Sequence, residues 1–436
     1  MPSYLSPGVY VEEVPPLARP IAGVGTSTPG FIGVIPNTIQ LPARTKTGDL
    51  AADIARGFKF VTFDYAEAGK GRAEAGRPYF ITSWTQYTRL FGDFIGDENA
   101  ALAAGTPAVN GGQRHLAHAI FGFFNNGGSS CYVARVVAAG DLDNALRAFA
   151  AIDEITIVAA PGLTGGTNYD KLISHCANTN LQDRVAILDP VETDTTFTTG
   201  DFVSKLQSPT TATPTPGLRP TNSTYAAFYF PWIQVFDPAT KLMDAKSDGL
   251  IYVPPSGHMA GIYGRNDSTR GVHKAPANEA VLGATGLKWA LSKADQDQLN
   301  DDGVNLIRSL NGAIRVWGGR TVGGDANGEF KYISTRRYFN FLRESIDEGT
   351  QFVVFEPNSP ALWQRITRSV GDFLLGQWRG GALFGETPQK AFYVKCNDDT
   401  NPSDVRERGE VVTEIGVAIV KPAEFVIFRI QQQTGG

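Results

Sequence analysis

The residues in this chain that could do chemistry are few, and their spacing does not build a catalytic or metal site. His115 and His118 are three residues apart, so a helix would place both on one face. No glutamate completes an HExxH pattern, and no third ligand lies nearby in the sequence. We therefore expect both histidines to border the apolar face of a helix rather than to bind a metal.

A second candidate is the glycine-rich loop PGLTGGT at residues 161–167, which lies between a predicted strand and a predicted helix, as phosphate-binding loops do. It lacks the lysine of the GxxxxGK[ST] motif, so it offers no cation to a phosphate. We interpret it as a plain turn. The carboxylate pairs at residues 12–13, 153–154 and 398–399 would point to opposite faces of an extended chain. The sequence thus indicates no enzyme and no cofactor.

The composition is that of a globular protein from a reducing compartment. The chain has 436 residues, enough for two or three domains, of which 42% are hydrophobic and 19% charged. A net charge of −5 gives no electrostatic reason to expect nucleic acid as a partner. The three cysteines form no CxxC, the N-terminus has no signal-peptide pattern, and no apolar run is long enough to cross a membrane. We expect cytoplasmic synthesis and no direct membrane insertion.

Hydrophobic periodicity predicts a mixed fold with more than one domain. Strand patterns at residues 155–160 and 185–189 flank a helical pattern at residues 168–177, which favours a parallel sheet covered by helices. Later in the chain, residues 352–355 predict a strand, and a serine–proline pair at residues 359–360 begins a long helix. The expected fold class is multidomain, α/β in the middle of the chain and α+β in its C-terminal half.

Two polar segments interrupt this pattern. Residues 37–78 and residues 207–224 carry few periodic apolar positions. We interpret the first as an insertion or a loosely packed outer loop, and the second as a surface loop.

Both ends of the chain contain strand patterns with no obvious partner. Residues 9–14 read VYVEEV and are followed by two prolines, and residues 424–433 read EFVIFRIQQQ. A strand at a chain end has backbone groups that must be paired elsewhere. We therefore predict that both ends are exchanged with neighbouring copies of the chain, through Val9, Tyr10, Val11, Val14, Phe425, Val426, Ile427, Phe428 and Ile430.

One charged surface is predicted on the long helix that begins at residue 359. Arg365, Arg368, Asp372 and Arg379 fall on one side of it, away from the apolar stripe. These residues form either an ordinary solvated face or a basic ridge that meets an acidic partner surface. The sequence leaves both interpretations open.

A series of motifs runs along nearly the whole chain. The longest is YVPPSGHMAGIY at residues 252–263, continued by RGVHKAPANE at residues 270–279. The others are SPGVYVEEV at 6–14, FITSW at 80–84, GFFNNGG at 122–128, FYFPWI at 228–233, RVWGGRT at 315–321, FVVFEPN at 352–358, ALFG at 382–385, FYVKC at 392–396 and EIGVAIVKPAEFVIFRI at 414–430. In this order they resemble the contractile tail sheath proteins of phage tails, tailocins and extracellular injection systems. The segment at 37–78 is not covered by the resemblance.

The resemblance implies a division of the chain by role. It gives an N-terminal arm at residues 1–22, an outer mixed α/β domain at 23–270 that carries the insertion at 37–78, an inner sheath core at 271–421 and a C-terminal arm at 422–436. It further implies hexameric rings, stacked helically around a rigid inner tube, whose contraction drives the tube through a target envelope.

The partners implied in this way are other copies of the chain, the tube protein, and baseplate and terminator or cap proteins. Arg365, Arg368 and Arg379 would be candidate tube contacts, in a particle assembled in the bacterial cytoplasm that is part of a phage tail or is released from the cell. Two other functions remain open: a non-contractile baseplate or cap component, and a cytosolic α/β nucleotide-binding enzyme built on residues 155–189.

Overall fold

The structure, a computed structural model, describes residues 20–44, 58–97, 110–192, 199–211, 217–244 and 246–428. The chain forms two compact units. Unit 1 comprises Met1–Val24 and Leu342–Val420, and unit 2 comprises Gly25–Phe341 and Lys421–Gly436. The predicted N-terminal strand residues Val9, Tyr10, Val11 and Val14 lie outside the described residues.

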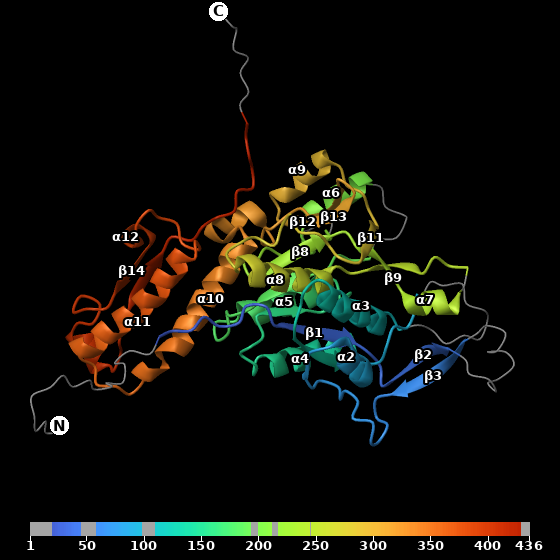
Figure 1. Cartoon of the computed structure of the whole chain (residues 1–436), viewed down its shortest axis with the longest axis horizontal. Helices are drawn as coiled ribbons and strands as arrows, with labels where there is room; N and C mark the ends of the chain where they lie inside the picture. Colours follow the sequence, from blue (N-terminus) through green and yellow to red (C-terminus); the bar gives the residue numbers. More distant parts are fainter. Residues whose placement is uncertain are drawn as a thin grey trace, which may run out of the picture. The chain divides into compact units, whose positions relative to one another are not determined.

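Unit 2 is organised by an eight-stranded sheet with the order β13-β12-β8-β7-β6-β1-β5-β4. Strands β1, β8, β12 and β13 of this sheet are labelled in Figure 1. The six central strands run parallel, and an antiparallel strand lies at each edge. The predicted parallel pairing around residues 155–189 is confirmed, because β6 and β7 are parallel neighbours. The strands are β1 (Pro29–Val34), β4 (Tyr79–Ile81), β5 (Cys131–Val136), β6 (Ile157–Ala159), β7 (Val185–Leu188), β8 (Ala226–Phe230), β12 (Val304–Leu310) and β13 (Ala313–Val316).

Helices cover both faces of this sheet, which is why its strands are apolar on both sides. On β1, Phe31 belongs to one hydrophobic cluster and the next residue, Ile32, belongs to the other. The first cluster includes residues of α3 (Gly111–Asn125) and α8 (Ser256–Arg270). The second includes residues of α4 (Leu142–Phe149), α5 (Gly166–Ala177), α6 (Thr199–Gln207) and α9 (Lys293–Asn300).

Glycine allows α3 and α8 to pack closely in the first cluster. A Cβ atom placed on Gly257 would lie 2.3 Å from backbone atoms of Ala119. A Cβ atom on Gly261 would likewise lie 2.4 Å from the carbonyl oxygen of Phe123. Any larger side chain at these positions would overlap the backbone of α3, so this part of the longest sequence motif has a packing role. Further elements of unit 2 are α2 (Trp84–Phe91), α7 (Pro238–Met243) and a three-stranded sheet of β9 (Ile233–Phe236), β10 (Leu250–Val253) and β11 (Ala284–Leu287).

Residues 37–78 contain more structure than the predicted loose loop. An antiparallel pair of β2 (Thr38–Arg44) and β3 (Phe58–Asp64) lies within them. Ile39, Tyr65 and Ala73 join the first hydrophobic cluster. The prediction was wrong in this respect because a few buried side chains, without helical or strand periodicity, are enough to hold this segment on the core.

Residues 207–224 are likewise more than a surface loop. The side chain of Arg219 is 5% exposed. Its guanidinium donates to the carbonyl oxygen of Gln207 and to Oδ1 of Asn222, and lies 3.7 Å from Asp302. The described part of this segment is therefore fastened to unit 2 by a buried cation.

Unit 1 is built around the C-terminal part of α10 (Ile333–Thr350), which begins in unit 2, and around α11 (Pro360–Arg379). The predicted apolar stripe of α11 is buried and consists of Trp363, Ile366, Val370, Phe373 and Leu374. A two-stranded antiparallel sheet follows, formed by β14 (Phe392–Lys395) and β15 (Glu414–Val417). The short helices α12 (Pro388–Ala391) and α13 (Ser403–Glu407) complete the unit.

The described end of the N-terminal segment packs in unit 1. Val24 N donates to Oγ of Ser345 at 3.1 Å. A Cβ atom on Gly349 would lie 2.6 Å from the side chain of Ile21, so glycine makes room for that side chain on α10.

The strand predicted at residues 352–355 is absent. The chain forms the 3-10 turn η3 (Gln351–Val353) instead. Phe355 has a φ of 66° and its side chain is fully exposed. The prediction of a strand was wrong because the last members of this apolar run, Val354 and Phe355, are exposed to solvent and do not pack in the core.

The unit boundary also differs from the predicted domain boundary at residue 271. Strands β11 and β12 lie beyond that residue but pair with the earlier strands β9 and β8 of unit 2, and β13 pairs with β12. The units therefore divide between Phe341 and Leu342. The assignment of an outer and an inner domain remains a prediction.

Candidate functional site: the C-terminal segment and its anchor

His115 and His118 both lie on α3 of unit 2, where His115 is half-buried and His118 is buried. His115 packs edge-on against Trp232, with ring centroids 5.1 Å apart, and burial lowers its pKa well below the ordinary value. His118 Nε2 lies 3.5 Å from Oδ1 of the buried Asp237. Among the residues that the structure describes, no three or more His, Cys, Asp or Glu side chains are grouped so that they could hold a metal ion. The described helices include none that is long and apolar enough to span a membrane.

The loop at residues 161–167 contacts an internal carboxylate. Gly162 N donates to Oδ2 of Asp189 at 3.3 Å, and Ser256 donates to the same carboxylate through its backbone N at 2.8 Å and its hydroxyl at 2.6 Å. Burial raises the pKa of Asp189 to about 7, although these hydrogen bonds favour its ionised form. The loop therefore fastens β7 to the first residue of α8, which is a structural role.

The C-terminal segment, defined here as residues 421–428, forms neither a helix nor a strand in the single chain. Its apolar side chains Phe425, Val426, Ile427 and Phe428 are 70%, 68%, 79% and 85% exposed. Ile430 lies outside the described residues. Four consecutive apolar side chains in solvent are costly at about 25 cal/mol per Å² of apolar surface, so this segment is a candidate contact surface.

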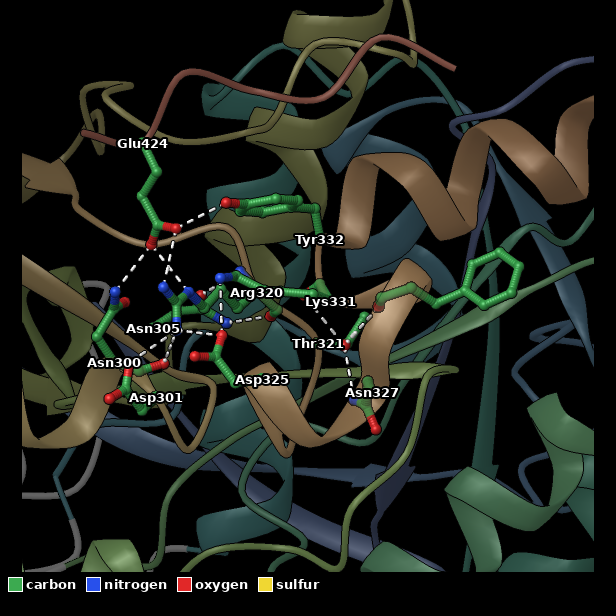
Figure 2. A network of polar contacts seen from close by, with 11 residues as sticks. Asn300, Asp301, Asn305, Arg320, Thr321, Asp325, Asn327, Lys331, Tyr332 and Glu424 are labelled. Atoms are coloured by element: carbon green, nitrogen blue, oxygen red, sulfur yellow. Dashed lines mark hydrogen bonds and ion pairs between the residues drawn. The ribbon is translucent and has the colours of Figure 1, made fainter. Parts of the chain in front are cut away.

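One side chain fastens the root of this segment to unit 2. The Glu424 carboxylate accepts four hydrogen bonds (Figure 2). Its Oε1 accepts from Arg320 Nε at 2.8 Å and from Asn300 Nδ2 at 2.8 Å. Its Oε2 accepts from Arg320 Nη2 at 2.9 Å and from the Tyr332 hydroxyl at 2.8 Å. The paired bonds from Arg320 form a bidentate fork, which is the strongest geometry for this kind of pair.

The other side of the Arg320 guanidinium is neutralised independently of Glu424. Its Nη1 donates to Asp325 Oδ1 at 3.1 Å, to Asp301 Oδ1 at 3.3 Å and to the carbonyl oxygen of Asn300 at 2.9 Å. The Arg320 side chain is 2% exposed, whereas those of Asp301 and Asp325 are 73% and 53% exposed. Burial opposes ionisation of Glu424, but the hydrogen bonds from Arg320, Asn300 and Tyr332 outweigh it and lower the pKa of Glu424.

The backbone around Arg320 is also held. Arg320 N donates to Asn305 Oδ1 at 2.7 Å, and Asn305 Nδ2 donates to the carbonyl oxygen of Arg320 at 2.8 Å. Because Asn305 belongs to β12 of the large sheet, these hydrogen bonds hold the backbone of Arg320 at a fixed position on that sheet. Sequence reasoning missed this network, since Arg320 and Glu424 are 104 residues apart and no local pattern links them.

Of the three arginines in the predicted basic ridge of α11, Arg365 has an ion-pair partner within the chain. Arg365 lies 3.4 Å from Glu356 and its guanidinium lies 5.2 Å from the ring centroid of Phe352, so it holds the preceding turn. Arg368 and Arg379 are exposed and make no hydrogen bond or ion pair with the residues that the structure describes. The two interpretations of this face therefore both remain open for Arg368 and Arg379.

Within the described residues of unit 1, β14 and β15 pair only with each other. Each strand thus presents one unpaired edge, and a two-stranded sheet is marginal by itself. Tyr393 on β14 is 59% exposed and Phe384, which precedes the sheet, is 73% exposed. This sheet offers backbone groups and apolar surface to an added strand.

Comparison with known proteins places this architecture in a family. The model of the phage tail sheath protein central domain matches residues 136–322, and that of the phage tail sheath C-terminal domain matches residues 325–433. The tail sheath protein of Vibrio phage KVP40 is 26% identical over 189 residues, which are 42% of this chain and 27% of that protein. The tail sheath protein of Burkholderia phage BcepMu is 23% identical over 219 residues, 48% of this chain and 43% of that protein. The chain thus spans half or less of the curated relatives it matches.

Solved sheath structures match over nearly the full length. The sheath of the PVC extracellular contractile injection system, in its contracted state, has 25% identity and a TM-score of 0.69, covering 99% of both chains. The helical sheath of the anti-feeding prophage, also contracted, has 26% identity and a TM-score of 0.67, covering 98% of this chain and 99% of that chain. The chain therefore belongs to the contractile tail sheath proteins, as a structural subunit of a contractile system.

Proposed function

We propose that this chain polymerises into hexameric rings stacked helically around a rigid inner tube, and that contraction of the polymer drives the tube through a target envelope. The partners in this proposal are further copies of the chain, the tube protein, and baseplate and terminator proteins. Assembly takes place in the bacterial cytoplasm, and the particle is a phage tail or a released tail-like particle. The protein acts mechanically and not as an enzyme.

The observation that carries the proposal is the exposed C-terminal segment. Its apolar residues leave their own unit immediately after an anchored glutamate, in a sequence with strong strand propensity. Strand addition to a neighbour would satisfy both the backbone and the side chains. A head-to-tail contact that does not close on itself generates a helical polymer.

The acceptor in this proposal is the β14–β15 sheet of a neighbouring copy. It has open edges and exposed aromatic side chains, whereas the backbone of residues 421–428 pairs with none of the residues that the structure describes. The N-terminal arm, through Val9, Tyr10, Val11 and Val14, would add to a neighbour in the same manner. Arg368 and Arg379 would face an acidic surface of the tube.

Truncation of the C-terminal arm tests this proposal. A chain that ends at Glu424 keeps the anchor and loses Phe425–Phe428 and everything after them. Each lost hydrogen bond is worth about 0.5–1.5 kcal/mol and each buried apolar side chain about 1.5–3 kcal/mol. After the ordering entropy of about 1–2 kcal/mol per residue is subtracted, several kcal/mol per joint should be lost.

The truncated subunit should therefore remain a soluble monomer that forms no tubes by negative-stain electron microscopy. Its melting temperature should stay within about 2 °C of the full chain, because the removed described side chains are exposed. A chain that ends at Ile430 is the matched control and should form tubes. A truncated subunit that melts early would mean that the segment belongs to its own core, and normal tubes would mean that it is no joint.

A further inference from the structure

Glu424 accounts for all polar contacts of the C-terminal segment within the described part of the chain. The backbone groups of residues 421–428 take part in no hydrogen bond there, and the four apolar side chains after Glu424 are exposed. The Glu424 side chain, in contrast, is only 20% exposed. Among the described residues, the polar contacts that hold the segment to unit 2 are thus those of Glu424, directly before the residues proposed to join a neighbour.

The site that holds Glu424 has the properties of a carboxylate receptor. Arg320, Asn300 and Tyr332 supply four donors to two oxygens, all at 2.8–2.9 Å (Figure 2). The receptor is preformed in unit 2, because Asn305 fixes the backbone of Arg320 and a bridge pairs Arg320 with Tyr332. It therefore sets where the segment leaves the unit.

The charges of the network allow Glu424 to leave as well as to bind. The group contains two cations, Arg320 and Lys331, and three carboxylates, those of Asp301, Asp325 and Glu424. Without Glu424, two cations face two carboxylates, and Arg320 keeps both aspartates as partners. Detachment of Glu424 therefore does not leave the guanidinium of Arg320 without a carboxylate partner. This matters because a buried charge is costly chiefly when it has no partner.

We infer that Arg320, Asn300 and Tyr332 form a latch for the Glu424 carboxylate, which holds the root of the C-terminal arm in the direction required for strand donation and can release it without leaving the buried Arg320 guanidinium unpaired. This inference rests on the proposed strand exchange. Glu424 is a positioning residue: it contacts its own subunit and acts on the joint through Phe425–Phe428. Pre-organisation of this kind reduces the ordering entropy that binding must overcome.

Electron paramagnetic resonance on the full-length chain tests the latch directly. A nitroxide is placed at Val426→Cys, which is exposed, in a Cys396→Ser background. Cys131 and Cys176 are buried and burial raises the pKa of both thiols, so they should not react with the label. Measurements are made on unpolymerised subunit, below the concentration at which tubes form.

Glu424→Ala should shift the nitroxide spectrum towards fast motion and leave the melting temperature within a few degrees. Glu329→Ala is the control, because it removes an exposed carboxylate from the same region without touching the network. In unlabelled protein, Glu424→Ala should raise the critical concentration for tube formation about tenfold, which corresponds to about 1.4 kcal/mol per added subunit. Glu424→Gln, which keeps the shape of the side chain, should have the same direction of effect and serves if the alanine variant fails to fold.

Two results would overturn the inference. An unchanged nitroxide spectrum in Glu424→Ala would mean that the carboxylate does not hold the arm. A mobile arm with an unchanged critical concentration would mean that holding it has no role in assembly. Absence of tubes from the unsubstituted chain is a different failure: it refutes the proposed function, while the spectrum still decides whether the arm is anchored.

Discussion

The charge arrangement around Arg320 predicts that the cost of losing Glu424 depends on two aspartates. In the unsubstituted background, Glu424→Ala removes the bidentate pair but leaves Arg320 with Asp301 and Asp325. Hydrogen bonds to charged groups contribute about 1.5–3 kcal/mol, and the remaining aspartates and entering water offset part of the loss. We expect Glu424→Ala to lower the free energy of unfolding by about 1–2 kcal/mol.

In a chain that carries Asp301→Asn and Asp325→Asn, the same substitution leaves the buried guanidinium of Arg320 without a carboxylate partner among the residues that the structure describes. Removing the last partner of a buried charge costs about 3–5 kcal/mol. The two aspartates are exposed, so their own replacement should cost only about 0–1 kcal/mol each while Glu424 is present. The coupling between Glu424 and the aspartate pair should therefore be about 2 kcal/mol.

Urea unfolding of the four chains, at a concentration where the subunit is monomeric, measures this coupling as a double-mutant cycle. Glu329→Ala, introduced into both backgrounds, controls for a general effect of removing a carboxylate and should cost the same in each. If Glu424→Ala costs the same in both backgrounds, within about 0.5 kcal/mol, then Arg320 does not depend on these aspartates and the proposed release of Glu424 lacks its physical basis.

Three further predictions concern the charged face of α11, the backbone at Phe355 and the pH dependence of the Glu424 contacts. Arg368→Glu combined with Arg379→Glu should reduce the extended sheath formed on tubes, counted by electron microscopy, while leaving sheath-only polymer, because both side chains are exposed and proposed to face the tube; normal extended particles would mean that this face is merely solvated. Phe355→Gly should raise the free energy of unfolding by about 1 kcal/mol in urea titration. The φ of 66° is unfavourable for a residue with a side chain, and the phenyl ring that the substitution removes is fully exposed. A loss of stability would show that the ring makes stabilising contacts. The unsubstituted chain and Glu424→Gln should differ most in free energy of unfolding near pH 7, and this difference should shrink as the pH falls below the ordinary glutamate pKa of about 4.3. The reason is that the folded state lowers the pKa of Glu424, so the stabilisation by its carboxylate is lost when the carboxylate is protonated. A difference that grows with acidification would contradict this prediction.

The periodic elements of the fold could be predicted from the sequence, and the non-periodic ones could not. The parallel strands β6 and β7 and the apolar stripe of α11 follow from patterns that repeat within a few residues, and the structure confirms them. Residues 352–355 show the limit of this reasoning. Their apolar run is typical of a strand, but only tertiary context decides that Phe355 points into solvent.

One part of the candidate site could be predicted from the sequence and another part could not. The unpaired apolar character of Phe425–Phe428 could be seen in the sequence, because it needs only local information. The latch could not, because its carboxylate and its guanidinium are brought together by the return of the chain to unit 2 after residue 420. The boundary between the two compact units could not be seen in the sequence for a related reason: β12 pairs with β8, a strand more than seventy residues earlier, and such pairing leaves no local signal.

Cryo-electron microscopy of the polymer formed by the purified full-length chain tests the central claim most directly. We predict hollow helical tubes built from rings of six subunits, in which residues 425–430 of one subunit pair as a strand with the β14–β15 sheet of another. A uniform small oligomer, or a tube in which these residues fold back onto their own subunit, would contradict the account.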